Sequence, residues 1–239
     1  MINQQLFELY SSKWDDLCRA MQPIIEDNDK WQKPAYPLLL KIDKEEEYLN
    51  ADIRVMIFGQ ETKGWELNEM PKYIDDDFQK IINLYDDFYN HNRSFYKQRG
   101  PFMSEIRKLR EIFEGQFSKK IPFVWNNIIK IGQHGDKGRT PLYIYEIERK
   151  YFSVIKDEIE ILKPNVIIFL TGPSYYKEIT DNFGKINFPA FSSFTTNQLS
   201  KVSLPEIRFA YRTYHPGYLY RKGREFKERV FNTILQDIV

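Results

Sequence analysis

Short runs of consecutive apolar residues alternate along the chain with stretches in which apolar positions recur every three or four residues. Continuous apolar runs of this length are typical of buried strands. Four such runs predict strands, at 53–58, 123–129, 165–170 and 207–212. The helical spacing predicts three helices, at 103–113, 143–162 and 224–239. Strands that alternate with helices favour a sheet covered by helices on both faces. We therefore predict an α/β fold, a three-layer α/β/α sandwich around a mostly parallel four-stranded sheet.

The chain of 239 residues has the length of one domain with an ample core. We predict a single domain over 1–239, with an N-terminal helical extension over about 1–50 and an insertion over about 66–99. The insertion contains the acidic runs 75–77 and 86–87, and its composition predicts a helix with loops.

Composition narrows the function only slightly. The net charge of +1 gives no global signal for nucleic acid, although residues 201–229 contain eight basic and three acidic residues. This excess indicates either a local basic face or a solvated helix. Aromatic residues make up 16% of the chain, which suits either a large core or flat ligands such as nucleobases.

Cysteine use and hydropathy exclude several classes of protein. Cys18 is the only cysteine, so an internal disulfide, a cysteine-rich zinc site and an iron–sulfur cluster are excluded. The first residues do not form a signal peptide, and no apolar run is long enough to span a membrane. We expect a cytoplasmic protein without a metal or another cofactor.

Polar segments follow the predicted strands, where open parallel sheets bind ligands. They are Gly59-Gln60-Glu61, Asn126-Asn127, Thr171-Gly172-Pro173-Ser174 and residues 213–218. We expect them to converge on one edge of the sheet. Each has a plainer interpretation: Gly59 turns the chain, Glu61 is solvated, Asn127 caps a turn and His215 is structural. His91 and His134 lack such a context, and we interpret both as surface residues.

The order of five segments resembles the uracil-DNA glycosylase superfamily, and the family 4 and family 5 type most closely. The segments are Gly59-Gln60-Glu61, Gly100-Pro101-Phe102-Met103, Trp125-Asn126-Asn127-Ile128-Ile129-Lys130 followed by Gly138-Arg139-Thr140-Pro141, residues 162–168, and Thr213-Tyr214-His215-Pro216 with Leu219 and Arg221 behind. The resemblance covers roughly residues 53–239.

This resemblance implies excision of a base that has been extruded from DNA. Phe102 would stack on the base, Asn127 would hydrogen-bond its Watson–Crick edge, and His215 would stabilise charge on the departing base. Glu61 would orient water, and Gln60 would offer its backbone amide or its side chain nearby. Gly59 would be among the residues that bind the base. The segment after His215 would contact DNA through Tyr218, Leu219, Arg221 and Lys222, with Leu219 or Tyr218 as a wedge.

Several positions depart from the family pattern and leave the preferred base open. The first motif lacks the usual proline after its third position and contains Lys63 and Trp65, and Gly217 stands where serine or a small residue is common. The absence of cluster cysteines excludes the cluster-bearing subfamily.

Three functions stay open. The first is a DNA glycosylase for uracil or another deaminated or damaged base, with DNA as its partner and a monomeric state. The second is a non-catalytic module of the same fold that binds a nucleotide or nucleic acid. The third is an unrelated hydrolase of small molecules.

Overall fold

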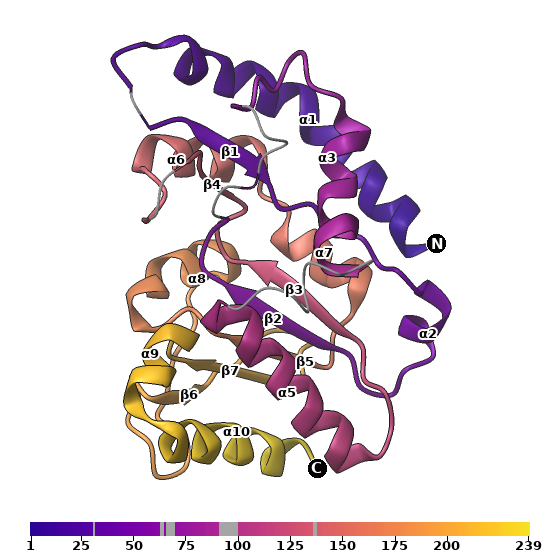
Figure 1. Cartoon of the computed structure of the whole chain (residues 1–239), viewed down its shortest axis with the longest axis vertical. Helices are drawn as coiled ribbons and strands as arrows, with labels where there is room; N and C mark the ends of the chain where they lie inside the picture. The colour runs from indigo at the N-terminus through magenta and orange to yellow at the C-terminus, as the bar shows by residue number, and fades with distance from the viewer. Residues whose placement is uncertain (31, 63–64, 66–69, 91–99, 136–137) are drawn as a thin grey trace. The chain divides into compact units, whose positions relative to one another are not determined.

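The computed structural model describes the whole chain except residues 31, 63–64, 66–69, 91–99 and 136–137 (Figure 1). The chain forms two compact units, each assembled from separated segments. The first unit contains residues 1–45, 60–92 and 127–162, and the second contains 46–59, 93–126 and 163–239. The prediction of one domain with an extension and an insertion remains a prediction.

A five-stranded sheet forms the centre of the second unit. In spatial order, its strands are β3 (Phe123–Asn127), β2 (Val55–Gly59), β5 (Val166–Phe169), β7 (Phe209–Thr213) and β6 (Leu199–Lys201). Strands β2, β5 and β7 are parallel, whereas β6 runs antiparallel to β7. The predicted α/β class with a mostly parallel sheet is confirmed. The prediction of four strands is wrong, because the three residues of β6 are too few to show a periodic pattern.

Helices cover both faces of this sheet. On one face, the rings of Phe58 and Phe169 contact Phe183 of α8 (Tyr176–Phe183). On the other face, the Tyr211 hydroxyl donates a hydrogen bond to Asp237 of α10 (Arg224–Ile238). Figure 1 shows α5 (Pro101–Phe117) in front of the strands. Burial on both faces explains why β2 and β5 are apolar throughout.

Two short helical elements lie at the carboxyl ends of the strands. The 3-10 helix η2 (Pro173–Tyr175) follows β5, and α9 (Pro216–Lys222) follows β7. Proline at the first position of α9 is favourable because that position needs no N–H donor. Gly223, with φ at 95°, ends α9 and allows α10 to begin immediately. The short helix α2 (Glu45–Leu49) precedes β2 in the chain.

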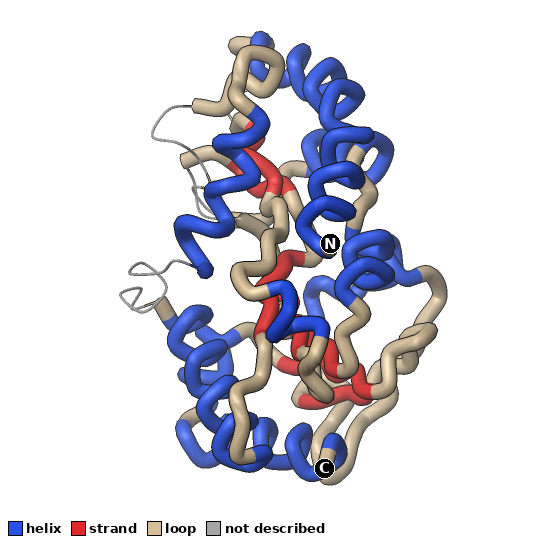
Figure 2. Tube along the Cα trace, turned by 90° about the vertical axis from the view of Figure 1, so that its right-hand side faces the viewer, coloured by secondary structure: helices blue, strands red, loops and turns tan. Residues whose placement is uncertain are grey.

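The first unit is mainly helical (Figure 2). Its helices are α1 (Ile2–Glu26), α3 (Phe78–Tyr85), the π-helical turn η1 (Asp86–Asn90), α6 (Leu142–Tyr151) and α7 (Ile155–Leu162). A two-stranded antiparallel sheet joins β1 (Pro34–Pro37) to β4 (Ile131–Gln133). Helix α1 contacts both α6 and α7.

The predicted helix 143–162 is divided in the structure into α6 and α7. Phe152 ends α6 with a non-helical backbone, and its ring stacks on Tyr10 of α1 at 6.1 Å between centroids. Phe152 and Val154 are fully buried. Because no glycine or proline marks this position, the break is set by packing rather than by a local sequence signal.

No described helix combines the length and apolar character needed to cross a membrane. Cys18 is buried on α1, and burial raises the pKa of its thiol to about 12.

Candidate functional site

The carboxyl ends of β2, β5 and β7 lie at one edge of the sheet in the second unit. The amide of Leu170 donates to the carbonyl of Phe58 at 2.8 Å, which continues the ladder past the end of β5. The amide of Gly172 donates to the carbonyl of Thr213 at 3.0 Å. These bonds tie the segment after β5 to both neighbouring strands, at the edge where β7 leads into His215.

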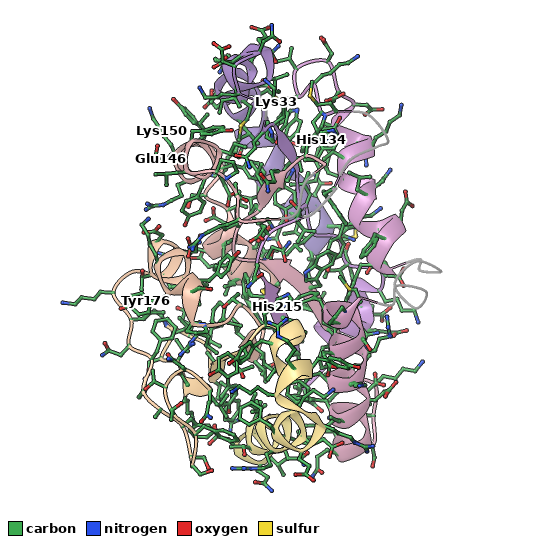
Figure 3. All side chains as sticks on the ribbon, turned by 60° about the vertical axis from the view of Figure 1, so that its left-hand side comes forward. Lys33, His134, Glu146, Lys150, Tyr176 and His215 are labelled. Atoms are coloured by element: carbon green, nitrogen blue, oxygen red, sulfur yellow. The ribbon has the colours of Figure 1, made fainter. Side chains whose placement is uncertain are left out.

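Phe102 and His215 are in ring contact in the second unit. Their ring centroids are 5.9 Å apart and the ring planes differ by 16°, so the rings are nearly parallel. Phe102 is the second residue of α5, and His215 is the N-cap residue of α9. Both side chains are half-buried, so the stack reaches the protein surface. Figure 3 shows His215 where the yellow helix α9 begins.

The hydrogen bond that caps α9 determines the donor on His215. Its Nδ1 accepts a hydrogen bond from the amide of Gly217 at 3.2 Å. A neutral imidazole has one nitrogen that accepts and one that carries the proton. The proton of neutral His215 is therefore assigned to Nε2, which becomes a hydrogen-bond donor.

Helix α9 presents aromatic and basic side chains and contains no acidic residue. The rings of Tyr214 and Tyr218 are 4.4 Å apart, and the Tyr218 ring also contacts Arg221 at 5.4 Å and Lys222 at 5.3 Å. Arg221 and Lys222 are exposed, whereas Leu219 is fully buried. Leu219 therefore packs inside this unit in the structure, and Tyr218 is the more accessible of the two residues expected to act as a wedge.

Gln60, Glu61 and Asn127 lie in the first unit, whereas Gly59, Phe102 and residues 213–222 lie in the second. The amide of Ile129 donates to the carbonyl of Gln60 at 3.0 Å. The loop that carries Glu61 is thereby bonded to the segment that follows Asn127. Gln60 and Glu61 are half-buried, and Asn127 is buried at the end of β3.

A second contact fixes the same loop. Thr62 is buried, and its Oγ1 accepts a hydrogen bond from the amide of Gly132 at 2.8 Å. A Cβ atom at position 132 would lie only 1.8 Å from the Thr62 carbonyl oxygen. Only glycine allows this close approach of two backbones. The sequence predictions did not include Gly132, which follows the predicted strand 123–129 between Ile131 and Gln133, where no local pattern marks the close approach.

A buried polar network supports the segment after Asn127, and the sequence predictions did not include it. Glu148 of α6 accepts hydrogen bonds from the amides of Lys130 and Ile131, each at 2.8 Å. The Lys130 ammonium lies 2.6 Å from Glu158 of α7. The available signal was two glutamates at buried positions of the predicted helix 143–162.

Burial shifts the pKa values of this network. It raises the pKa of Glu148 to about 8, although the two backbone amides oppose that rise. It lowers the pKa of Lys130, against the attraction of Glu158. It also raises the pKa of Tyr10, whose hydroxyl donates to Glu158 at 2.7 Å.

The remaining expectations concern histidines and metals. His134 is half-buried, and its amide donates to the carbonyl of Lys33 at 2.8 Å (Figure 3). His91 and Lys63 lie outside the described residues. Residues 66–69 and 91–99 of the expected insertion also lie outside them. Trp65, which departs from the family pattern, is buried. Within the described part of the chain, no group of three or more histidine, cysteine, aspartate or glutamate residues is placed to hold a metal ion.

Comparisons with protein-family models and with curated proteins found no match to this sequence.

Proposed function

We propose that the protein hydrolyses the N-glycosidic bond of uracil or another deaminated or damaged base in DNA. The observation that carries this proposal is the nearly parallel pair of Phe102 and His215, 5.9 Å apart. An aromatic platform beside a hydrogen-bond donor is the combination that holds a flat base and stabilises it as it leaves. His215 follows β7, and Phe102 lies in the first turn of α5. The carboxyl end of β7 is at the edge where open sheets of this class bind ligands.

His215 is the proposed stabiliser of the leaving base. Cleavage of the bond leaves negative charge on the base, which its carbonyl oxygen shares. Because Nδ1 accepts the Gly217 amide, neutral His215 carries its proton on Nε2, and an N–H group is the donor that this oxygen requires. A donor held in advance where charge develops lowers the barrier without reorganisation during the reaction.

Glu61 and Asn127 have the other two proposed roles. Glu61, as a carboxylate, orients the water that attacks the sugar carbon. The Asn127 amide, which offers both a donor and an acceptor, reads the Watson–Crick edge of the base. The bond from Ile129 to Gln60 supports these roles, because it holds the Glu61 loop against the segment after Asn127 within the first unit.

The acid-free helix α9 is the proposed contact to the DNA backbone. Lys and Arg near phosphates supply sequence-independent affinity, and aromatic rings such as Tyr218 supply stacking surfaces for bases. This observation also favours the second candidate, a module that binds nucleic acid without cleaving it. That function needs Tyr218, Arg221 and Lys222, which are partly or fully exposed, but does not need Glu61.

A base-release assay separates the two candidates. The purified protein is incubated with single-stranded and duplex oligonucleotides that contain uracil, hypoxanthine or xanthine, and abasic sites are detected by alkaline cleavage. The glycosylase proposal predicts abasic sites with at least one base and a loss of about 100-fold or more in Glu61→Gln. Glu146→Gln, at an exposed position of α6, is the matched control and should retain full activity. DNA binding without base release on any substrate would favour the binding module instead.

A further inference from the structure

Arg212 is a buried cation at the carboxyl end of β7. Its exposed fraction is 2%. Strand pairing places it beside Phe169 of β5 and Ser200 of β6, and Phe169 in turn pairs with Phe58 of β2. In-register residues of paired strands share one face of a sheet. Arg212 therefore lies in a row of side chains, between Phe169 and Ser200, on the face that α8 covers.

Among the described residues, the groups that contact the Arg212 guanidinium are neutral. Its Nη2 donates to the carbonyl of Thr196 and to the hydroxyl of Ser200, the latter at 2.9 Å. The guanidinium carbon lies 5.3 Å from the centre of the Phe188 ring. Its Nε and Nη1 are buried and donate no hydrogen bond to any described residue.

The other buried basic residues of the described chain each have a carboxylate partner. Three basic residues are buried, Lys130, Arg212 and Lys227. Lys130 has Glu158 at 2.6 Å, and Lys227 has Glu105 at 2.8 Å. Arg212 forms no ion pair with a described carboxylate. Buried charges in proteins are ordinarily paired, because an uncompensated one is costly.

Cation–π contact and two hydrogen bonds to neutral acceptors compensate only part of that cost. Contact of a guanidinium with an aromatic ring stabilises it less than the loss of a partner destabilises a buried charge. In keeping with this imbalance, burial lowers the pKa of Arg212. An anion that accepts from Nε and Nη1 would compensate the rest.

We propose that Arg212 is the binding group of a phosphate site. The planar fork of a guanidinium matches the oxygens of phosphate, and it stays charged when buried better than an ammonium does. The excess of basic residues over 201–229 attracts anions to this part of the chain. The phosphate is either free or part of a nucleic-acid backbone, and the proposal does not depend on glycosylase activity.

Access to Arg212 is through the segment that covers it. Residues 184–198 contain no helix and no strand apart from an isolated bridge at Ala190, and most of them are exposed. The covering ring of Phe188 contacts Tyr176, which is 52% exposed and lies on α8 (Figure 3). Irregular segments that are largely exposed open at lower cost than the helices and strands of the core. Displacement of Phe188 admits the phosphate to Nε and Nη1.

Titration of the full chain with inorganic phosphate, followed by thermal unfolding and calorimetry, tests the site. Phosphate should raise the Tm of the wild type in a saturable way, since it binds the folded state. Arg212→Met should lose the response, with binding at least tenfold weaker, and without phosphate should be no less stable than the wild type. Arg208→Met removes an exposed arginine from just before β7 and should respond as the wild type does.

The opposite results overturn the proposal. Equal phosphate responses in wild type and Arg212→Met place the anion elsewhere, and no response to phosphate or to a single-stranded oligonucleotide excludes the site. A response to the oligonucleotide alone, lost in Arg212→Met, identifies backbone phosphate as the ligand. Should Arg212→Met fail to fold, the ¹⁵Nε resonance of Arg212 in the wild type decides: it should shift saturably on titration, and an unmoved resonance rejects the proposal. If the protein releases no base from DNA, the glycosylase proposal fails, but these tests of the phosphate site keep their meaning.

Discussion

The ammonium of Lys130 lies 2.6 Å from a carboxylate oxygen of Glu158, and both side chains are fully buried. The Tyr10 hydroxyl donates to the same oxygen. This pair joins the segment after Asn127 to α7, and through Tyr10 to α1. All three residues belong to the first unit, so the pair should contribute to the stability of that unit.

Lys130→Met should strongly destabilise the protein. Removal of one member of a buried ion pair costs about 3–5 kcal/mol, because the other charge is left uncompensated. Urea unfolding followed by circular dichroism measures the loss. Adding Glu158→Leu to Lys130→Met should recover part of it, and Lys156→Met, an exposed position on α7, should change little. A loss below 1 kcal/mol in Lys130→Met would show that the pair does not stabilise the unit.

Glu148 should make stability fall as pH rises from about 5 to 8. Burial raises its pKa from an ordinary 4.5 to about 8, so the folded protein holds this proton more tightly than the unfolded chain does. Unfolding then releases a proton, and the free energy of unfolding decreases by up to about 1.4 kcal/mol per pH unit in this window. The difference in unfolding free energy between wild type and Glu148→Gln isolates this residue from Lys130 and Glu158. A difference that stays constant from pH 5 to 8 contradicts the shift.

Gly132→Ala should destabilise the protein and displace the Glu61 loop. The added Cβ would lie 1.8 Å from the Thr62 carbonyl oxygen, so one of the two backbones must move. Overpacking of this kind costs about 1–3 kcal/mol, measured by chemical unfolding. Gly115→Ala on α5 is the matched control, because nothing lies within 4 Å of its added Cβ. It should be neutral or up to about 1 kcal/mol more stable. Equal stability of the two variants would refute the close approach.

Replacement of Arg221 and Lys222 by alanine should weaken DNA binding and flatten its salt dependence. Each lost phosphate contact to single-stranded DNA reduces the slope of log K against log salt by about 0.7. Fluorescence anisotropy at several salt concentrations gives the slope. Alanine at Lys119 and Lys120, which are exposed before β3, provides a control of equal charge loss. If both pairs flatten the slope equally, α9 is not the DNA contact.

The sequence predicted the parallel core of the sheet well, for a physical reason. Strands β2 and β5 overlap predicted runs because strands buried on both faces are apolar throughout. Strand β7 overlaps its predicted run through its apolar start, Phe209-Ala210-Tyr211. The sequence did not predict β6 or the break between α6 and α7, which depend on contacts with residues distant in the chain. Strand β6 has three residues, and the break at Phe152 depends on packing against Tyr10. Neither leaves a periodic pattern.

In the candidate site too, local sequence identified single residues but not the contacts between residues that are distant in the chain. Local sequence singled out Phe102 and His215 but gave no distance between them, since their contact depends on the placement of α5 and α9. Glu148 and Glu158 continue the helical spacing of apolar residues in the predicted helix 143–162, but their partner Lys130 is distant in the chain and could be identified only in the structure. Arg212 is similar, because only the structure shows that it lacks the carboxylate that other buried cations have.

Single-turnover base release by the wild type and His215→Asn tests the proposed catalysis most directly. With saturating protein on the best substrate of the panel, the wild type should generate abasic sites. His215→Asn should be about 100-fold slower or more, because the preorganised donor to the leaving base is lost. DNA affinity of the variant should be unchanged, and His134→Asn should match the wild type. Equal rates for wild type and His215→Asn, or no base release by the wild type on any substrate, would contradict the account.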